Sequence, residues 1–403
     1  MCIGFWSLEH PDYALILCSN RDEYLARPTT PAHWHAFEMP VERDPYAAVP
    51  EHGPPRAVSP SASASTVTDA SESHSDAASD PGPAAAGVPR GSVLSGRDLR
   101  AGGTWLGISR AGRVAFLTNI TEDSGPFAST RGALTSSFLL PDPALPHSET
   151  PETYAEHLVR AGGSYAGFNL LLLAPSPSRS SSSLSPEGTG GLTYDAAFVT
   201  NHGGGLPLAT RGLSPAERRC GALSNGVDGR GADAWPKVRQ GTALFADVLA
   251  ELGMDVRSDA DVVGTTSPRP ATAASTKPKT ADEADEMRLV ERLFALLTWH
   301  PPTPPRARAD LKHTIQIPPL RIRADASAAA KGGPPPVYGT RAATALLVRR
   351  DGRALFVERD VWVLDERGEA VRGEVGRQRV VRFDVEVELD GNAAGAGDGD
   401  GGR

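Results

Sequence analysis

Pairs of short apolar segments separated by turn residues limit the fold of this chain more than any other feature. Three such pairs predict β-hairpins: residues 2–8 with 13–19, 103–109 with 113–120, and 342–348 with 354–358. The third pair flanks Asp351-Gly352, a dipeptide that tolerates positive φ and favours a tight turn. Residues 168–173 form a continuous apolar run, which predicts a buried central strand. The chain is therefore expected to be rich in antiparallel sheet.

Helical periodicity is confined to a few segments. Three amphipathic segments predict helices: residues 151–161, 240–252 and 283–299. Near the C-terminus, apolar and polar side chains alternate over residues 381–389, which predicts a strand with one solvent-exposed face. Hairpins combined with a few amphipathic helices indicate an α+β layered fold rather than alternating β-α-β units.

Four stretches have low-complexity composition and few large apolar side chains. They are residues 49–90, 175–191, 259–280 and 391–403. Such stretches bury too little apolar surface to offset the entropy cost of ordering, so we expect three disordered insertions and a disordered Gly/Asp tail. Setting them aside leaves roughly 300 residues, which fits a single domain over residues 1–390.

Charge and cysteine usage exclude several classes of protein. The net charge is −8 with acids and bases interleaved, so no basic stripe is present to bind nucleic acid. The three cysteines are widely spaced without a CxxC motif, which favours a reducing compartment and predicts neither disulfides nor a metal site or cofactor. The best apolar run, residues 168–174, is too short to span a bilayer, and acidic residues at positions 9 and 12 argue against a targeting leader. We therefore expect a cytoplasmic protein.

Cys2 directly follows the initiator methionine and opens the first strand. Removal of Met1 would place a thiol and a free α-amino group on one residue. An α-amino group has a reference pKa of about 7.7–8.0, so it is suited to accept the thiol proton while the thiolate attacks a carbonyl. The alternative interpretation is a small apolar strand residue. Cys18 and Cys220 are expected to be a core residue and a loop thiol.

The sequence Asn20-Arg21-Asp22-Glu23 follows the second strand, so a tight hairpin would return it beside Cys2. Arg21 would then stabilise the thiolate and Asp22 would hold the α-amino group. A solvated turn is the alternative interpretation of the same four residues.

Two asparagines and a late arginine complete the candidates. Asn119 ends a predicted strand and Asn225 falls in a glycine-flanked segment expected to be a loop. An asparagine amide is a suitable oxyanion donor, although asparagine also favours turns for local reasons. Arg341 opens a predicted strand and could fix a carboxylate or phosphate.

Seven short motifs occur in the order typical of the NRDE family, also called the transport and Golgi organisation 2 family, which this chain resembles. They are MCIGFW (1–6), SNRDEY (19–24), GGTWLGIS (102–109), FLTN (116–119), GFNL (167–170), LSN (223–225) and YGTR (338–341). The resemblance implies roles in Golgi organisation, protein secretion, and lipid and haem homeostasis. It also implies that the protein associates with the Golgi or mitochondria and that its partners include secretory-pathway proteins.

The resemblance also implies a four-layer αββα sandwich of the N-terminal-nucleophile hydrolase type. By position, its catalytic residues match Cys2, Arg21, Asp22, Asn119, Asn225 and Arg341. One departure concerns the aspartate, which in those hydrolases lies three residues after the arginine, where this chain has Tyr24. This departure puts hydrolysis in question more than the fold.

Three hypotheses stay open at this point. The first is a hydrolase that cleaves a C–N or thioester bond in a small acylated molecule. The second is a non-catalytic binding or trafficking protein for a lipid-like ligand or haem. The third is a scaffold that binds secretory-pathway proteins through its Ser/Pro-rich insertions.

Overall fold

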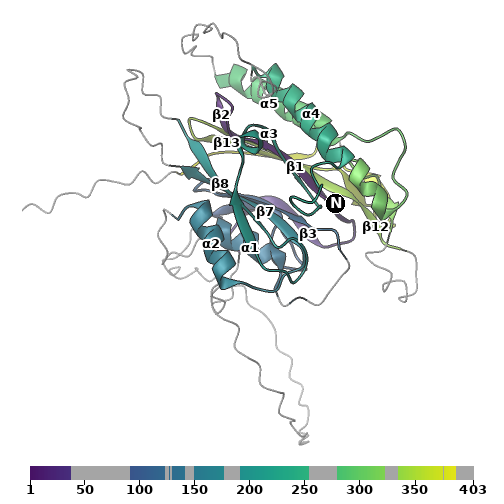
Figure 1. The fold of residues 1–403 in the computed structure, drawn as a ribbon. Coiled ribbons are helices and arrows are strands. Elements are labelled where there is room, and N and C mark those ends of the chain that lie inside the picture. The colour runs from purple at the N-terminus through teal and green to yellow at the C-terminus, as the bar shows by residue number, and fades with distance from the viewer. Residues whose placement is uncertain are drawn as a thin grey trace, which may run out of the picture.

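Two antiparallel sheets form the centre of the computed structural model (Figure 1). The structure describes residues 1–37, 91–122, 127, 129–140, 149–176, 191–253, 279–322, 335–374 and 376–386. The predicted insertion 49–90, most of the insertions 175–191 and 259–280, and the tail 391–403 lie outside these residues. At the edges of the described part, residues 175 and 176 end a strand and residues 279 and 280 begin a helix.

The first sheet has the order β10-β1-β2-β12-β13-β16, with β11 paired to β12. Its strands are β1 (Ile3–Ser7), β2 (Tyr13–Tyr24), β10 (Gly221–Ser224), β11 (Leu320–Arg321), β12 (Val337–Arg349), β13 (Arg353–Asp360) and β16 (Gln378–Asp384). The predicted β1–β2 and β12–β13 hairpins are confirmed, and the alternating C-terminal segment pairs with β13. A separate pair, β14 (Trp362–Leu364) and β15 (Ala370–Arg372), follows β13.

The second sheet runs in sequence order from β3 to β9. Its strands are β3 (Thr29–His35), β4 (Val93–Asp98), β5 (Leu106–Ser109), β6 (Val114–Asn119), β7 (Phe168–Ser176), β8 (Thr193–Thr200) and β9 (Ala209–Gly212). The predicted β5–β6 hairpin is confirmed, and β7 is a buried strand between β6 and β8. Each strand pairs with its neighbour in sequence, and the connections range from the tight turn between β5 and β6 to residues 120–167 between β6 and β7.

Helices cover the outer face of each sheet (Figure 1), and one short helix directly precedes β10. They are α1 (Arg131–Leu139), α2 (Pro151–Ala161), α3 (Pro215–Cys220), α4 (Pro236–Glu251) and α5 (Lys279–Leu297), with a 3-10 helix at Arg308–His313. The predicted α2 has the observed bounds, whereas α4 and α5 begin four residues earlier than the periodicity indicated. Among the described helices, none combines the length and apolar character needed to cross a bilayer.

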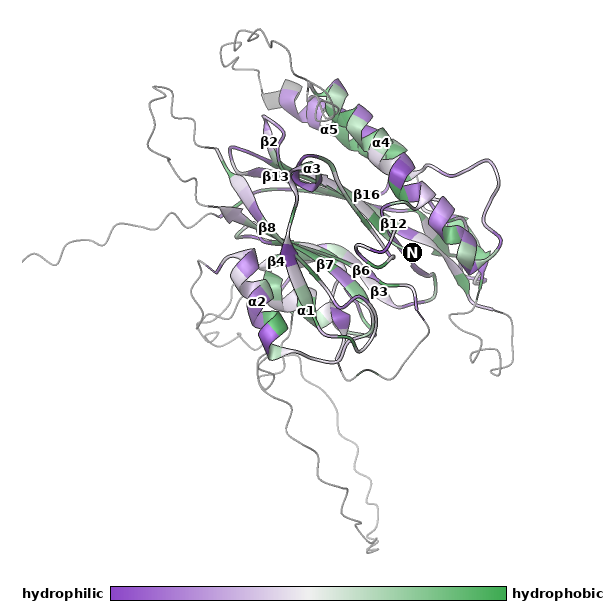
Figure 2. Ribbon diagram, in the orientation of Figure 1, coloured by the Kyte–Doolittle hydropathy of each residue, from purple (hydrophilic) through white to green (hydrophobic). Residues whose placement is uncertain are grey.

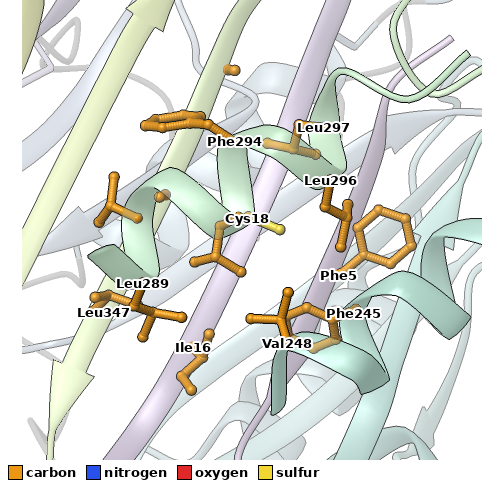
Figure 3. Packing of buried hydrophobic residues seen from close by; sticks show 14 of the residues in the cluster. Phe5, Ile16, Cys18, Phe245, Val248, Leu289, Phe294, Leu296, Leu297 and Leu347 are labelled. Carbon is orange, nitrogen blue, oxygen red and sulfur yellow. The ribbon is translucent and has the colours of Figure 1, made fainter. Parts of the chain in front are cut away.

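Three apolar clusters hold these layers together. One joins α4 and α5 to the first sheet and contains Phe5, Phe245 and Phe294 together with Cys18 (Figure 3). The second lies between the two sheets and includes Trp6, and the third joins α1 and α2 to the second sheet. Helices α4 and α5 carry both hydrophobic and hydrophilic residues along their length (Figure 2), as expected for helices with one buried face. Burial of apolar side chains on both faces of each sheet is the main stabilising contribution.

The solvated-turn alternative for Asn20–Glu23 is excluded, because β2 continues to Tyr24 and its end pairs with β12 from Tyr338 onward. Two local predictions were wrong. Leu223 and Ser224 do not lie in a loop but in β10, which pairs with β1. Cys220 is not a loop thiol but the last residue of a short helix, Pro215–Cys220. For β2 and β10, a partner strand distant in sequence supplies the backbone hydrogen bonds that local residues do not predict.

Candidate active site around Cys2

Cys2 lies one residue before β1, at the end of the first hairpin. The register places Ile3 opposite Asn20, so Cys2 falls beside Arg21 and Asp22. The Asp22 backbone N–H donates to Cys2 Sγ at 3.4 Å, and the thiol faces the Asp22 carbonyl oxygen at 3.8 Å. Burial raises the pKa of the Cys2 thiol, so the thiol is protonated at neutral pH in the chain that retains Met1.

Met1 is held at three points. Its α-amino nitrogen lies 3.4 Å from Asp22 Oδ2 and contacts the Tyr338 hydroxyl. Its carbonyl oxygen accepts a hydrogen bond from Lys237 Nζ at 2.9 Å, and its sulfur contacts the Thr121 hydroxyl at 2.9 Å. Burial lowers the pKa of the α-amino group, because its charged form loses hydration. Asp22 therefore pairs with the amino group of Met1 rather than with one on Cys2.

Asp22 is fixed by contacts on both its side chain and its backbone. The Thr340 hydroxyl donates to Asp22 Oδ1 at 2.6 Å, and the Tyr338 hydroxyl donates to the Asp22 carbonyl at 3.1 Å. Thr340 is itself held by the N–H of Ile317, which donates to its hydroxyl at 2.8 Å. The carboxylate is thus oriented by β12, the strand that pairs with the end of β2.

Arg21 is the most unusual charged residue of the site. The residue is only 6% exposed, and its guanidinium carbon lies 3.9 Å from the ring centroid of Trp105. Among the described residues it has no hydrogen-bond or ion-pair partner, and burial lowers its pKa. Stacking on tryptophan stabilises the cation but leaves its N–H donors unused.

A cavity of about 270 Å³ opens beside these residues. It is lined by four of the six predicted residues, namely Cys2, Arg21, Asp22 and Asn119, together with Trp105 and Arg131. Arg131 begins α1 and donates to the Gly167 carbonyl at 2.9 Å. Gly103 and Gly132 form another part of the wall, where a Cβ on Gly103 would lie 2.4 Å from the Gly132 carbonyl carbon. The two glycines therefore let α1 approach the β5–β6 hairpin closely.

A third arginine in the cavity wall already has partners. Arg27 Nε lies 2.7 Å from Asp98 Oδ2 and 3.8 Å from Glu23 Oε2. Its charge is therefore balanced inside the protein, unlike that of Arg21.

Asn119 and Asn225 are neighbours but face different spaces. The Asn225 side-chain amide donates to the Asn119 carbonyl oxygen, and Asn225 Oδ1 is buried without a hydrogen-bond partner. Asn225 lines a second cavity of about 230 Å³, together with Thr121 and Trp235, whereas Asn119 lines the cavity of Cys2. The strands β6 and β10 bring the two asparagines together at their ends.

Arg341 lies outside the wall of the Cys2 cavity. Its guanidinium donates to the Arg27 carbonyl oxygen. Burial, followed by repulsion from Arg21, lowers the pKa of Arg341 to about 10. It is thus a neighbour of the cavity lining rather than part of it.

Three residues around Cys2 were not identified from the sequence. Lys237 is fully buried at the start of α4, and Tyr338 and Thr340 lie on β12. Burial lowers the pKa of Lys237 to about 8, although the nearby Asp22 and Cys2 oppose this change. Tyr338 and Thr340 belong to a motif already noted, YGTR, whereas no sequence signal marks Lys237. The described residues include no cluster of His, Cys, Asp or Glu that could hold a metal ion.

The fold and site define an α+β protein of two antiparallel sheets with a polar cavity beside an N-terminal cysteine. The profile of the family "Transport and Golgi organisation 2" matches residues 1–82 and 82–362, so the chain belongs to this family. A Bos taurus protein named Transport and Golgi organization protein 2 homolog is 27% identical over 273 residues, which are 67% of this chain and 77% of the bovine protein.

Two further similarities cover different extents of the chain. A Mus musculus protein named Transport and Golgi organization 2 homolog is 39% identical over 83 residues, which span 20% of this chain and only 28% of the mouse protein. The crystal structure of a C2A mutant of conjugated bile acid hydrolase from Clostridium perfringens aligns over 96% of this chain and 98% of its own, with 8% identity and a TM-score of 0.38.

Proposed function

We propose that the chain is an N-terminal-nucleophile hydrolase that acts on an amide or thioester bond of a small acylated molecule. The observation that carries this proposal is the grouping of Cys2, Arg21, Asp22 and Asn119 on one cavity. In acyl transfer a thiol can serve as nucleophile, a cation can stabilise its thiolate, a carboxylate can position a base, and an amide can donate to the oxyanion. The proposal includes a four-layer sandwich of the N-terminal-nucleophile type.

The active form of this enzyme lacks Met1. Its Cys2 α-amino group takes the thiol proton, and the thiolate attacks the substrate carbonyl carbon. The leaving amine or thiol departs with that proton, and water then releases the acid from Cys2 Sγ. Arg21 stabilises the thiolate and Asp22 positions the α-amino group. Asn119 binds the substrate or its oxyanion, and Asn225 holds the Asn119 backbone through the hydrogen bond of its amide. Arg341 supports Arg27 from outside the cavity.

The test compares three preparations of the full chain after removal of Met1: wild type, Cys2→Ala and Cys220→Ala. Cys220 is a matched control because it is another half-buried free thiol, away from the cavity. Each is screened against short-chain acyl amides and acyl thioesters, with intact mass used to detect an acyl-enzyme. Turnover that is lost in Cys2→Ala and kept in Cys220→Ala is expected. Equal turnover in both variants would exclude Cys2 as nucleophile.

A non-catalytic function is the second candidate, and one observation favours it. In the chain that retains Met1, Cys2 has no free amino group, burial raises its thiol pKa, and Asp22 is already paired with Met1. The cavity would then carry a lipid-like ligand or haem without chemistry. Saturable binding that is insensitive to Cys2→Ala, combined with no turnover, would support this function. No binding of fatty acids, acyl thioesters or haem at micromolar concentration would exclude it.

The cellular role is proposed from the family name alone. The bovine and mouse relatives are named for transport and Golgi organisation, and we propose a related role in secretion for this chain, as a cytoplasmic protein associated with the Golgi or mitochondria. Fractionation of cells that express the full chain, followed by a secretion assay in cells lacking it, tests this role.

A further inference from the structure

Met1 is bound in the manner of a ligand. Each of its functional groups has its own partner: Asp22 and Tyr338 for the α-amino group, Lys237 for the carbonyl oxygen, and Thr121 for the sulfur. The residue is only 7% exposed. Chain termini are usually solvated and poorly ordered, so a terminal residue with every polar atom matched is unusual.

The side chain of Met1 fills an apolar slot. It belongs to one cluster with Leu311 and Ile317, against which Trp235 and Tyr338 also pack. Met1, Leu311 and Ile317 belong to none of the three clusters that join the sheets and helices, although Trp235 also packs against the cluster of α4 and α5. Removing Met1 would therefore leave a shaped apolar surface next to Cys2.

Met1 also lies between the two cavities. Its partners Cys2 and Asp22 line the cavity of Cys2, and its partners Thr121 and Trp235 line the second cavity. A molecule that replaces Met1 would therefore have its carbonyl group beside Cys2 and its side chain toward Trp235.

We propose that the site filled by Met1 is a binding site for an α-aminoacyl group with an unbranched apolar side chain, available once Met1 is removed. This inference rests on the proposed function and deepens it by naming the acyl part of the substrate. Asp22 Oδ2, which accepts no hydrogen bond from the described residues in the chain that retains Met1, accepts one from the neutral α-amino group of Cys2 and pairs with the charged α-amino group of the ligand. The Tyr338 hydroxyl also contacts the ligand's amino group, Lys237 Nζ donates to its carbonyl oxygen, and the apolar slot receives its side chain.

The same contacts define what the site rejects. An N-acetylated compound brings no amino group to Asp22 and places an extra acyl group against Tyr338. A glycyl compound leaves the apolar slot unfilled, and an aspartyl compound places a charge in it. The site therefore selects its ligand by a charged contact to the amino group and an apolar contact to the side chain.

The test is a binding measurement that needs no turnover. The full chain carrying Cys2→Ala is produced as a fusion whose cleavage leaves residue 2 as the first residue, and L-methioninamide is titrated by calorimetry. N-acetyl-L-methioninamide and glycinamide serve as control ligands, and the chain that retains Met1 serves as control protein. We expect saturable binding of L-methioninamide, at least about tenfold weaker binding of both control ligands, and no binding to the Met1-retaining chain.

Two substitutions locate the site. Asp22→Asn is expected to weaken L-methioninamide at least about tenfold while leaving N-acetyl-L-methioninamide unchanged. Lys312→Met, at an exposed lysine of the 3-10 helix, is expected to leave both ligands unchanged. Equal affinity for the acetylated and free compounds, or binding to the chain that keeps Met1, overturns the inference.

The result of this binding experiment can be distinguished from the result of the hydrolysis experiment. If Cys2-dependent turnover is found with acyl compounds that lack an amino group and L-methioninamide does not bind, the inference fails and the hydrolase stands. If L-methioninamide binds as expected and no turnover is found, the inference on the binding site holds and the hydrolase fails.

Discussion

The carboxylate of Asp22 lies 3.4 Å from the α-amino nitrogen of Met1, inside the protein, at the open end of the first hairpin where its two strands end side by side. The pair places a titratable terminus, a carboxylate and a thiol in one buried environment. The predictions below follow from the charges in and around this environment.

Asp22→Asn should lower the stability of the chain that retains Met1. The substitution keeps the shape of the side chain but removes the negative charge beside Met1. It also weakens the hydrogen bond that the side chain of residue 22 accepts from the Thr340 hydroxyl. A buried polar group left without its partner costs about 1–3 kcal/mol, and we expect a loss in this range in urea unfolding. Asp12→Asn, at an exposed turn position, is the control and should change the free energy of unfolding by less than about 0.5 kcal/mol. A similar loss in both variants would contradict the prediction.

Lys237 should make stability depend on pH. Its pKa is about 8 in the folded protein against an ordinary value of 10.5, so between these values the unfolded chain holds a proton that the folded chain lacks. The free energy of unfolding therefore gains a contribution that rises with pH through this window, by up to about 1.4 kcal/mol per pH unit.

The matched variant for this prediction is Lys237→Met, which keeps an unbranched side chain but does not titrate. Urea unfolding at pH 7.5 and pH 10 gives the difference between wild type and variant at each pH. Relative to the variant, the wild type should gain stability at the higher pH. An identical pH dependence of both proteins would show that the buried lysine is not titrating in this range.

Arg21→Met should abolish function at the Cys2 cavity with little change in the stability of the protein. The guanidinium is buried without an ion pair among the described residues, so its removal is expected to change the free energy of unfolding by less than about 1 kcal/mol, or to raise it. Ligand binding or turnover at the Cys2 cavity should be lost in the same variant. Arg211→Met is the contrast, because Arg211 pairs with Glu217 at 2.8 Å and Asp228 at 2.9 Å, away from the cavity. That variant should keep function, and the opposite pattern would contradict the assignment of Arg21 to the site.

Gly103→Ala should destabilise the wall of the cavity. The added Cβ would lie 2.4 Å from the backbone of Gly132, which lies in the first turn of α1 and cannot move without shifting the helix. Overpacking of this kind costs about 1–3 kcal/mol. Gly212→Ala is the control, since a Cβ at that strand position meets nothing within 4 Å. Thermal unfolding of both variants measures the difference in melting temperature. Equal melting temperatures would contradict the close approach of Gly103 to Gly132.

Sequence patterns predicted the locally paired parts of the fold. The turns at residues 10–12 and 351–352 specify hairpins because the paired strands are adjacent in the chain, and the apolar stripes of α2, α4 and α5 repeat at helical spacing. Three of the four candidate residues that line one cavity meet for the same reason, since the β1–β2 hairpin brings Cys2 to Arg21 and Asp22. The fourth, Asn119, comes from β6 of the second sheet, so its position depends on the packing of the two sheets.

The other parts of the candidate site depend on contacts between segments that are distant in sequence. Whether Asn225 faces the same cavity as Asn119, and whether Arg341 reaches the cavity, is decided by how β10 and β12 pair with β1 and β2. By itself the sequence determined the hairpins, the amphipathic helices and the conjunction of Cys2 with Arg21 and Asp22, because these follow from short-range periodicity and turn geometry. The tertiary structure alone decided that Lys237 and Tyr338 surround Met1, since long-range packing carries no local signature in the chain.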